Sequence, residues 1–237
     1  MNTKGTLYLI PTTLGVEAEI SESLPSHIEK IINEIDDYIV ENEKSARHFL
    51  KKMGIKKSLN DISLYVLNTQ STPEIFSSYL NAIESGKNMG IISEAGCPCI
   101  ADPGAVMVKL AHQKKIKVVP LTGPSSILLA LMASGFNGQN FTFHGYLPKE
   151  KNDRVRKIKE LEKNIFQKQQ TQIFIETPYR NQHLLEDILA SCASNTLLCV
   201  ACDITLPSEM IITQRIAEWQ KKLPDIHKRP TIFLLYN

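Results

Sequence analysis

The sequence lacks any apolar run near the roughly 20 residues that span a bilayer. Its first residues, MNTKGTLYLIPTT, also lack the long apolar core of a signal peptide. Neither sign of charge dominates, because 27 Lys and Arg face 25 Asp and Glu and give a net charge of +2 at pH 7. This balance argues against a strongly basic nucleic-acid coat, although it leaves a local basic face open. Together these absences predict a cytoplasmic protein without membrane contact.

Cysteine is also scarce, with five residues in 237. An odd number of thiols, most of them in apolar strand patterns, is a poor disulfide framework. The pairs Cys97-x-Cys99 and Cys199-x-x-Cys202 suggest a metal site at first sight. However, Cys199 and Cys202 lie in the strand-like run LLCVACDI, where positions three apart point to opposite faces. Zinc ligands must converge, so we expect buried thiols and no metal.

The common motifs of nucleotide and hydrolase chemistry are absent. There is no Walker A loop, no G-x-G-x-x-G, no H-E-x-x-H and no G-x-S-x-G. What the sequence has instead is a set of loops rich in Gly, Pro, Ser and Thr at predicted strand ends: Pro11–Gly15, Glu94–Gly104, Thr122–Ser126, Glu176–Arg180 and Ile204–Pro207. Such loops offer backbone N–H and C=O groups more than reactive side chains. They suit a small molecule, such as a nucleoside cofactor, held in a cleft between two halves.

Residues 1–121 alternate short apolar runs with amphipathic helical patterns. The predicted strands are Leu7–Ile10, Tyr38–Val40, Ile62–Leu67, Met89–Ile92 and Lys117–Pro120, and the helices between them are Leu24–Ile35, Ser45–Met53, Pro73–Ser85 (capped by Thr72) and Ala105–Gln113. This βαβα order predicts an α/β domain with a mainly parallel sheet covered by helices on both faces.

Residues 122–237 are less regular and predict a second α/β domain with a mixed sheet. Its predicted strands are Phe141–Gly145, Thr171–Glu176, Leu197–Asp203, Glu209–Thr213 and Thr231–Tyr236, and its helices are Ile127–Met132, Lys149–Gln170, Tyr179–Cys192 and Ile216–Leu223. The helix at 149–170 has a basic outer face with interspersed acids. This mixture favours a solvated helix surface over a dedicated phosphate-binding patch.

The stretch Met89–Gly104, MGIISEAGCPCIADPG, is the candidate centre of the site. An apolar strand leads to Ser93 and Glu94, then breaks at Gly96 and Pro98 before a helix begins. Ligands of open α/β sheets bind just outside such strand ends. An ordinary strand-to-helix turn remains the alternative interpretation.

The order of segments along the whole chain resembles a known family. GTLYLIPTTLG, IISEAGCPCIADPG, VVPLTGPSS, FHGYLP and IFIETPYR, followed by a final strand, resemble the S-adenosylmethionine-dependent methylases of the tetrapyrrole methylase superfamily. Within it, the chain is most similar to the branch that methylates a ribose 2′-hydroxyl of small-subunit ribosomal RNA, whose segments read LYxVPTPIGN, SDAGTPxISDPG, PxPGPSA, GFLP and FYESPHR.

The resemblance implies two α/β domains, S-adenosylmethionine bound between them, a homodimer and an RNA substrate of the small ribosomal subunit. By motif position, it assigns these cofactor-binding residues: Pro11, Ser93, Ala95, Gly96, Cys97, Ile100, Ala101, Ser125, Ser126, Glu176, Thr177, Ile204, Pro230 and Thr231. Methyl transfer of this kind requires alignment and exclusion of water rather than a metal.

The chain departs from that branch mainly in substrate-side segments. The Ala-Glu-Asp-Thr-Arg segment of the branch appears here as Val40 to Lys44 without Asp-Thr-Arg. The arginine of its Ala-Arg-Glu-Leu-Thr segment is replaced by Cys202, and its Gly-Glu before the last strand is replaced by Arg229-Pro230. A tetrapyrrole-like small molecule is therefore kept as an alternative acceptor, and a non-catalytic cofactor-binding module as another.

A hydroxyl acceptor would benefit from a general base. The carboxylates at predicted strand ends are Glu41, Glu43, Glu94, Asp102, Glu176 and Asp203. We favour Glu94 as the catalytic residue because it adjoins the cofactor loop, although it could instead hold that loop through backbone N–H groups. Asp102 is expected to cap a helix, and His144 to be a hydrogen-bonded core residue. Tyr146 and Tyr179 could stack on a base or pack half-buried.

Overall fold

The computed structural model describes residues 4–67 and 73–237. The chain forms two compact units, residues 1–125 and 126–237, and the sequence had placed its boundary after residue 121. In the part of the chain that is described, no helix is both long and apolar enough to cross a membrane.

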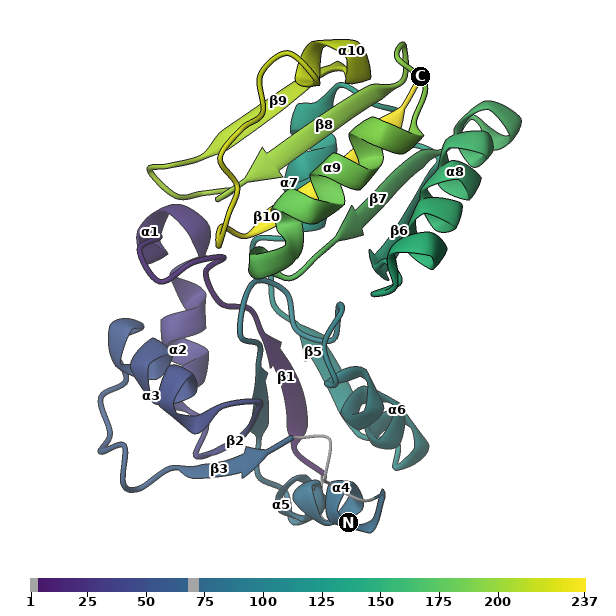
Figure 1. Ribbon diagram of the computed structural model, residues 1–237. Helices are drawn as coiled ribbons and strands as arrows, with labels where there is room; N and C mark the ends of the chain where they lie inside the picture. Colours follow the sequence, from purple (N-terminus) through teal and green to yellow (C-terminus); the bar gives the residue numbers. More distant parts are fainter. Residues whose placement is uncertain (1–3, 68–72) are drawn as a thin grey trace. The chain divides into compact units, whose positions relative to one another are not determined.

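The first unit is built on a five-stranded sheet in which all strands run parallel (Figure 1). Its order is β3 (Ser63–Val66), β2 (Asp37–Val40), β4 (Met89–Ile92), β1 (Thr6–Ile10) and β5 (Lys117–Pro120). The inner strands β2 and β4 are buried at every residue, as expected for strands covered on both faces. The predicted parallel sheet is therefore confirmed.

Helices cover both faces of this sheet, and side chains of one strand alternate between two apolar cores. Tyr38 and Val40 of β2 pack in a core with α2 (His27–Asn33) and α3 (Glu43–Lys52), whereas Ile39 packs in the other core with α5 (Asn81–Glu84) and α6 (Ala105–Gln113). The strand period of two assigns neighbouring residues to opposite faces.

Three predicted helix boundaries in the first unit were wrong. Helix α3 begins at Glu43 rather than Ser45, because the Asn42 side chain caps the N–H groups of residues 44 and 45. The predicted helix at 24–35 is the shorter α2, preceded by α1 (Ile20–Ser23). The predicted helix at 73–85 is broken at Leu80 into α4 (Pro73–Tyr79) and α5. Its expected cap, Thr72, lies outside the described residues.

The second unit contains a mixed five-stranded sheet, as predicted. Its order is β6 (Phe141–Tyr146), β7 (Thr171–Ile175), β10 (Thr231–Tyr236), β8 (Leu197–Cys202) and β9 (Met210–Arg215). Only β6 and β7 pair in parallel, and the other neighbours are antiparallel.

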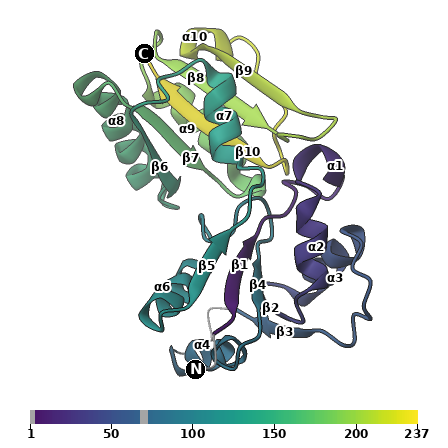
Figure 2. The same cartoon turned by 180° about the vertical axis from the view of Figure 1, so that it is seen from behind.

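Helices α8 (Lys151–Lys168) and α9 (Asn181–Ser191) lie on one face of this sheet, and α7 (Ser126–Ser134) lies on the other (Figures 1 and 2). The core under α8 and α9 contains Phe174 and Phe233, whose rings stack at 6.0 Å. The predicted helix at 216–223 was too long, because α10 (Ile216–Trp219) ends where the Trp219 indole is fixed by a bond to the Leu198 carbonyl.

Candidate functional site

The carboxyl ends of four parallel strands lie at one edge of the first sheet. Residues Pro11, Glu41, Ser93 and Leu121 directly follow β1, β2, β4 and β5. This is the edge at which open α/β sheets bind ligands. The sequence assigned cofactor contacts to two of these positions, Pro11 and Ser93.

Hydrogen bonds join the loop after β1 to the loop after β4. The Thr12 amide donates to the Gly96 carbonyl at 3.0 Å. The Ser93 hydroxyl lies 3.3 Å from the Thr12 hydroxyl and donates to the Gly96 carbonyl at 2.5 Å. Both hydroxyl-bearing residues are buried, so these bonds fix the two loops against each other and leave Gly96 at their junction.

Glycine is required at this junction by both conformation and space. Gly96 has φ +70°, and a Cβ there would lie 2.9 Å from the Leu14 side chain and from the Pro124 carbonyl oxygen. A Cβ at Gly123 would lie 2.3 Å from the Pro11 ring. Three loops therefore approach one another backbone to backbone, as the small residues predicted.

The rest of the loop after β4 is held in an unusual conformation. Cys99 and Ala101 have φ of 68° and 60°, a left-handed region that non-glycine residues seldom adopt. Asp102 stabilises it by accepting hydrogen bonds from the amides of Cys99 at 2.8 Å and Gly104 at 2.7 Å. Such strain often accompanies binding sites. Asp102 thus holds this loop, but it is not the helix cap that the sequence predicted, because the N-cap residue of α6 is Gly104 and no side chain caps the helix.

The neighbouring candidate residues Cys97 and Ile100 differ in exposure. The Cys97 thiol contacts the carbonyls of Gly123 and Pro124 at 3.6 and 3.4 Å, and burial raises its pKa. Ile100 is 54% exposed, which leaves its side chain accessible to a ligand. Ala95 is also exposed.

Two further carboxylates lie beside this loop. Glu94 accepts a hydrogen bond from the Ser45 hydroxyl at 2.6 Å, so it is anchored to α3 rather than to the amides of its own loop. Glu41 is half-buried, and its pKa is raised by burial and then by the charges of Asp102 and Glu94. Ser45 was missed from the sequence because 49 residues separate it from Glu94 and nothing local marks the contact.

In the second unit, Glu176 follows β7 and is nearly fully buried. Its carboxylate accepts from the Thr177 amide at 2.6 Å and from Arg180 Nη2 at 2.5 Å. Arg180 thus forms a salt bridge with Glu176. Glu176 organises the turn into η1 (Pro178–Arg180) through Oε1, which accepts both bonds.

The other candidate segments of the second unit lie on neighbouring strands. The Asp203 amide donates to the Pro230 carbonyl at 2.9 Å, and Thr231 pairs with Cys202 in the sheet. Arg229 donates from Nε to the Asp203 carboxylate at 2.8 Å. The branch that the chain resembles has an arginine at the position of Cys202. In this chain, Arg229 brings a guanidinium to this corner instead. Asp203, a candidate base, is occupied by this ion pair and by the Ser208 hydroxyl.

This corner also holds a polar atom that a ligand could satisfy. The hydroxyl of Thr205 is buried without a hydrogen-bond partner in the described part of the structure. Thr205 has φ +70° and follows Ile204, which is itself buried. A nucleoside offers the donors and acceptors that such a group lacks, so the residues present fit the cofactor that the resemblance implies.

The two units divide the predicted cofactor residues between them. Ser125 ends the first unit and Ser126 begins the second. The structure brings together Pro11, Ser93, Ala95, Gly96, Cys97, Ile100 and Ala101 in the first unit, and Ile204, Pro230 and Thr231 in the second. Glu176 and Thr177 occupy the separate turn after β7.

Of the remaining candidates, His144 is a partnered residue as expected. Its Nε2 lies 2.8 Å from the Gln172 side-chain oxygen, and burial lowers its pKa. Tyr146 and Tyr179 are 59% and 69% exposed, so neither packs half-buried. Within residues 4–67 and 73–237, no three side chains of His, Cys, Asp or Glu gather to hold a metal ion.

Comparisons with known proteins agree with this geometry. No protein-family model matches the chain. The ribosomal RNA small subunit methyltransferase I of Buchnera aphidicola from Schizaphis graminum is 30% identical over 99% of this chain and 79% of its own length. The protein of the same name from Escherichia coli O157:H7 is 30% identical over 93% of this chain and 74% of its own length.

A solved structure shows the same fold. The cobalamin biosynthetic enzyme cobalt precorrin-4 methyltransferase, CbiF, aligns with a TM-score of 0.63 at 13% identity, over 98% of this chain and 94% of its own. It confirms the predicted tetrapyrrole methylase fold of two α/β domains. With nearly its whole length matched to relatives of one name, the chain belongs to the ribosomal RNA small subunit methyltransferase I family and is a methyltransferase.

Proposed function

We propose that the protein transfers a methyl group from S-adenosylmethionine to a ribose 2′-hydroxyl of small-subunit ribosomal RNA. The observation that carries this proposal is the junction of three backbone-lined loops around Gly96, in a chain whose relatives are named for small-subunit ribosomal RNA. S-adenosylmethionine supplies a methyl group already activated by a sulfonium. Displacement at that carbon needs alignment of the two reactants, an effect worth about 7–11 kcal/mol.

The residues that would hold the cofactor are those of the two loop sets. In the first unit these are Pro11, Ser93, Ala95, Gly96, Cys97, Ile100 and Ala101, together with Ser125. In the second unit they are Ser126, Glu176, Thr177, Ile204, Pro230 and Thr231. Glycine at positions 96 and 123 allows these loops to approach one another closely, because a Cβ at either position would clash with its neighbours. The unpartnered Thr205 hydroxyl adds a polar contact to this set.

We propose Glu94 as the group that accepts the proton of the acceptor hydroxyl. It is exposed, it follows the central strand, and the Ser45 hydroxyl holds it in place at 2.6 Å. Glu41 is the second carboxylate at the same edge, and its raised pKa is of the kind that suits a base. Asp102 is excluded because both of its oxygens accept backbone amides.

The RNA acceptor is favoured over a tetrapyrrole. The chain shares 30% identity with rRNA methyltransferases but only 13% with the tetrapyrrole enzyme of the same fold. A cytoplasmic location and a homodimer, both expected from the sequence, belong to the same proposal. Light scattering of the purified protein would test the dimer by its mass.

Methyl transfer from tritiated S-adenosylmethionine, with small-subunit ribosomal RNA and uroporphyrin as separate acceptors, tests the proposal. We expect label in RNA only. Label in the tetrapyrrole alone would show that the methyl acceptor is the tetrapyrrole and not RNA. Tight cofactor binding by calorimetry, with no transfer to either, would indicate a non-catalytic module.

A further inference from the structure

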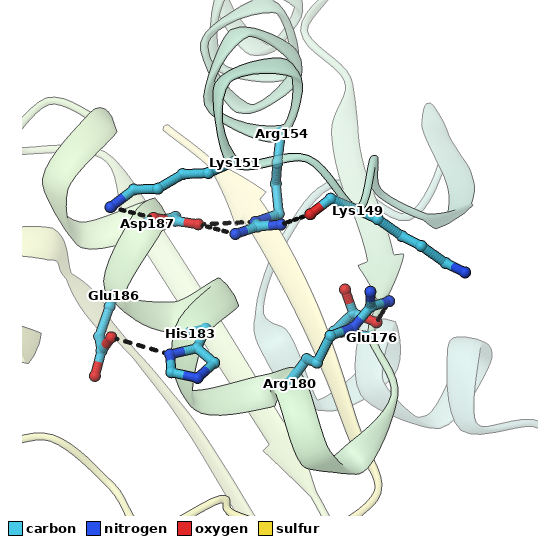
Figure 3. Close-up of a pocket in the computed structure, with 8 residues that line it drawn as sticks. All are labelled: Lys149, Lys151, Arg154, Glu176, Arg180, His183, Glu186 and Asp187. Carbon is cyan, nitrogen blue, oxygen red and sulfur yellow. Dashed lines mark hydrogen bonds and ion pairs between the residues drawn. The ribbon is translucent and has the colours of Figure 1, made fainter.

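The second unit contains a pocket of about 310 Å³ at the start of α8, beside η1 and α9 (Figure 3). Charged and titratable side chains form its lining: Lys149, Lys151, Arg154, Glu176, Arg180, His183, Glu186 and Asp187. Part of this lining is fixed by ion pairs, and part is not. That difference indicates what the pocket binds.

The fixed part is a buried guanidinium. Arg154 bonds the Asp187 carboxylate from Nε at 2.8 Å and from Nη2 at 2.6 Å. Its Nη1 donates to the Lys149 carbonyl at 2.6 Å. All its nitrogens are occupied and both side chains are about 90% buried, so this pair forms a rigid, electrically neutral base to the pocket. Arg180 and Glu176 form a second neutral pair.

The remaining lining carries an excess of positive charge. Among the described residues, no acidic side chain forms an ion pair with the Lys149 ammonium. The Lys151 ammonium is 3.8 Å from the already paired Asp187 and its side chain is 76% exposed. Glu186 is the one acid outside the neutral pairs, and it lies beside His183. Outside the two neutral pairs, the lining therefore contains two lysines, one acidic residue (Glu186) and His183.

Lys151 lies at a position that is unfavourable for α8 itself, and Lys149 lies just before this helix. Lys151 is the first residue of α8, and the N-cap residue Glu150 makes no side-chain capping bond. The N-terminal end of a helix is positive, so cations there destabilise it and anions stabilise it. Farther along α8, in contrast, Arg156 and Lys157 are paired with acids of their own helix. The solvated-surface interpretation of α8 accounts for these pairs, one of which includes Asp153 of the first turn, but it does not account for Lys149 and Lys151.

An exposed aromatic ring lies next to this pocket. Tyr179 directly precedes the lining residue Arg180 and is 69% exposed. The Lys228 ammonium lies 5.6 Å from its ring centroid, and the His227 ring meets its edge at 6.5 Å. An exposed ring with an ammonium group near it is an arrangement on which proteins stack bases of single-stranded nucleic acid. Inorganic phosphate has no aromatic surface that could stack on this ring.

We infer that the rim of this pocket binds the backbone of the RNA substrate: Lys149 and Lys151, which extend in opposite directions (Figure 3), each contact a phosphate, while a neighbouring base stacks on Tyr179. The inference rests on the proposed function, since it assumes an RNA acceptor. It assigns the recognition of the strand to the second unit. Base-edge contacts are not part of it, so the pocket positions the RNA and does not read its sequence.

The test compares two double variants of the full-length enzyme with equal loss of charge, one at the start of α8 and one farther along it. K149Q/K151Q removes the two pocket lysines, and K159Q/K163Q removes two exposed lysines of α8 that lie outside the pocket. Binding of unmodified small-subunit ribosomal RNA is measured over a range of salt, with cofactor binding measured by calorimetry. We expect only K149Q/K151Q to weaken RNA binding, and its slope of log affinity against log salt to fall by about 1. Cofactor binding should be unchanged in both.

A third variant, Y179L, keeps an apolar side chain and should weaken RNA binding without changing the salt slope. Equal RNA binding by K149Q/K151Q and K159Q/K163Q, in an enzyme that still methylates RNA, would overturn the inference and leave the proposed function intact. Inorganic phosphate bound by the unaltered enzyme and lost in K149Q/K151Q, with RNA binding unchanged, would also overturn it. If the unaltered enzyme neither binds nor methylates RNA, the proposed function fails and the inference fails with it.

Discussion

The Thr12 amide donates to the Gly96 carbonyl at 3.0 Å and ties the end of β1 to the loop after β4. These two strands are neighbours in the middle of the first sheet. Any movement of one loop is therefore transmitted to the other. The candidate cofactor loops behave as one preorganised unit, which reduces the ordering that binding requires.

Replacing Gly96 by alanine should damage this junction. The new Cβ would lie 2.9 Å from both the Leu14 side chain and the Pro124 oxygen, at a residue with φ +70°. We expect a loss of about 1–3 kcal/mol in unfolding free energy and weaker cofactor binding. Denaturant unfolding and calorimetry measure the two effects. The control is Gly138→Ala, where a Cβ meets nothing within 4 Å, and unaltered cofactor binding in the Gly96 variant would contradict the assignment of this loop.

Replacing Arg154 by methionine should strongly destabilise the second unit. Its partner Asp187 would remain buried with only the exposed Lys151 ammonium, 3.8 Å away, as a counter-charge, and breaking such a buried pair costs about 3–5 kcal/mol. Arg156→Met on the same helix removes an exposed guanidinium paired at the surface and should change stability by less than about 1 kcal/mol. Urea unfolding of both variants checks this. Similar losses for the two would show that Arg154 is not a structural residue.

Glu94→Gln should separate proton transfer from binding. If Glu94 accepts the hydroxyl proton, kcat falls by about 10²–10⁴-fold while cofactor affinity is kept. The amide still accepts the Ser45 hydrogen bond, so the local structure should survive. Steady-state kinetics on RNA measure the effect. An unchanged kcat would remove Glu94 from the mechanism, and the same experiment on Glu41→Gln would then test the neighbouring carboxylate.

The pH dependence of stability should report on Glu41. Burial, Asp102 and Glu94 raise its pKa in the folded state, so the protonated form is favoured by folding. Its contribution is fully present below the ordinary pKa of about 4.5 and is lost as the pH rises through the raised value. Glu41→Gln should therefore increase the unfolding free energy at pH 7 and make little difference near pH 4. A decrease at pH 7 would mean that the charged form is stabilised instead.

Much of the fold could be predicted from local pattern. The strands at 89–92 and 117–120 and the helix at 105–113 were predicted with their observed bounds, because an apolar run defines each element and a glycine or proline lies near at least one of its ends. The helix that begins at Glu43 was predicted two residues late, because the pattern did not reveal the capping role of Asn42. The break at Leu80 leaves no glycine or proline signal at all.

The candidate site was less accessible to prediction, because its decisive contacts join distant residues. The loop glycines and the bonds of Asp102 to the amides of Cys99 and Gly104 involve residues near in sequence. The partners Ser45 for Glu94 and Asp187 for Arg154 are 49 and 33 residues away, and no periodicity specifies such a contact. The ion pair between Arg229 and Asp203 likewise depends on the register of neighbouring strands, which no motif specifies.

The position of the transferred methyl group tests the account most directly. Small-subunit ribosomal RNA labelled by the enzyme from tritiated S-adenosylmethionine is digested completely with alkali, which needs a free 2′-hydroxyl to cleave each bond. The account predicts that the label appears in an alkali-resistant dinucleotide. Label released in mononucleotides would show a methylated base instead and would contradict the proposed reaction.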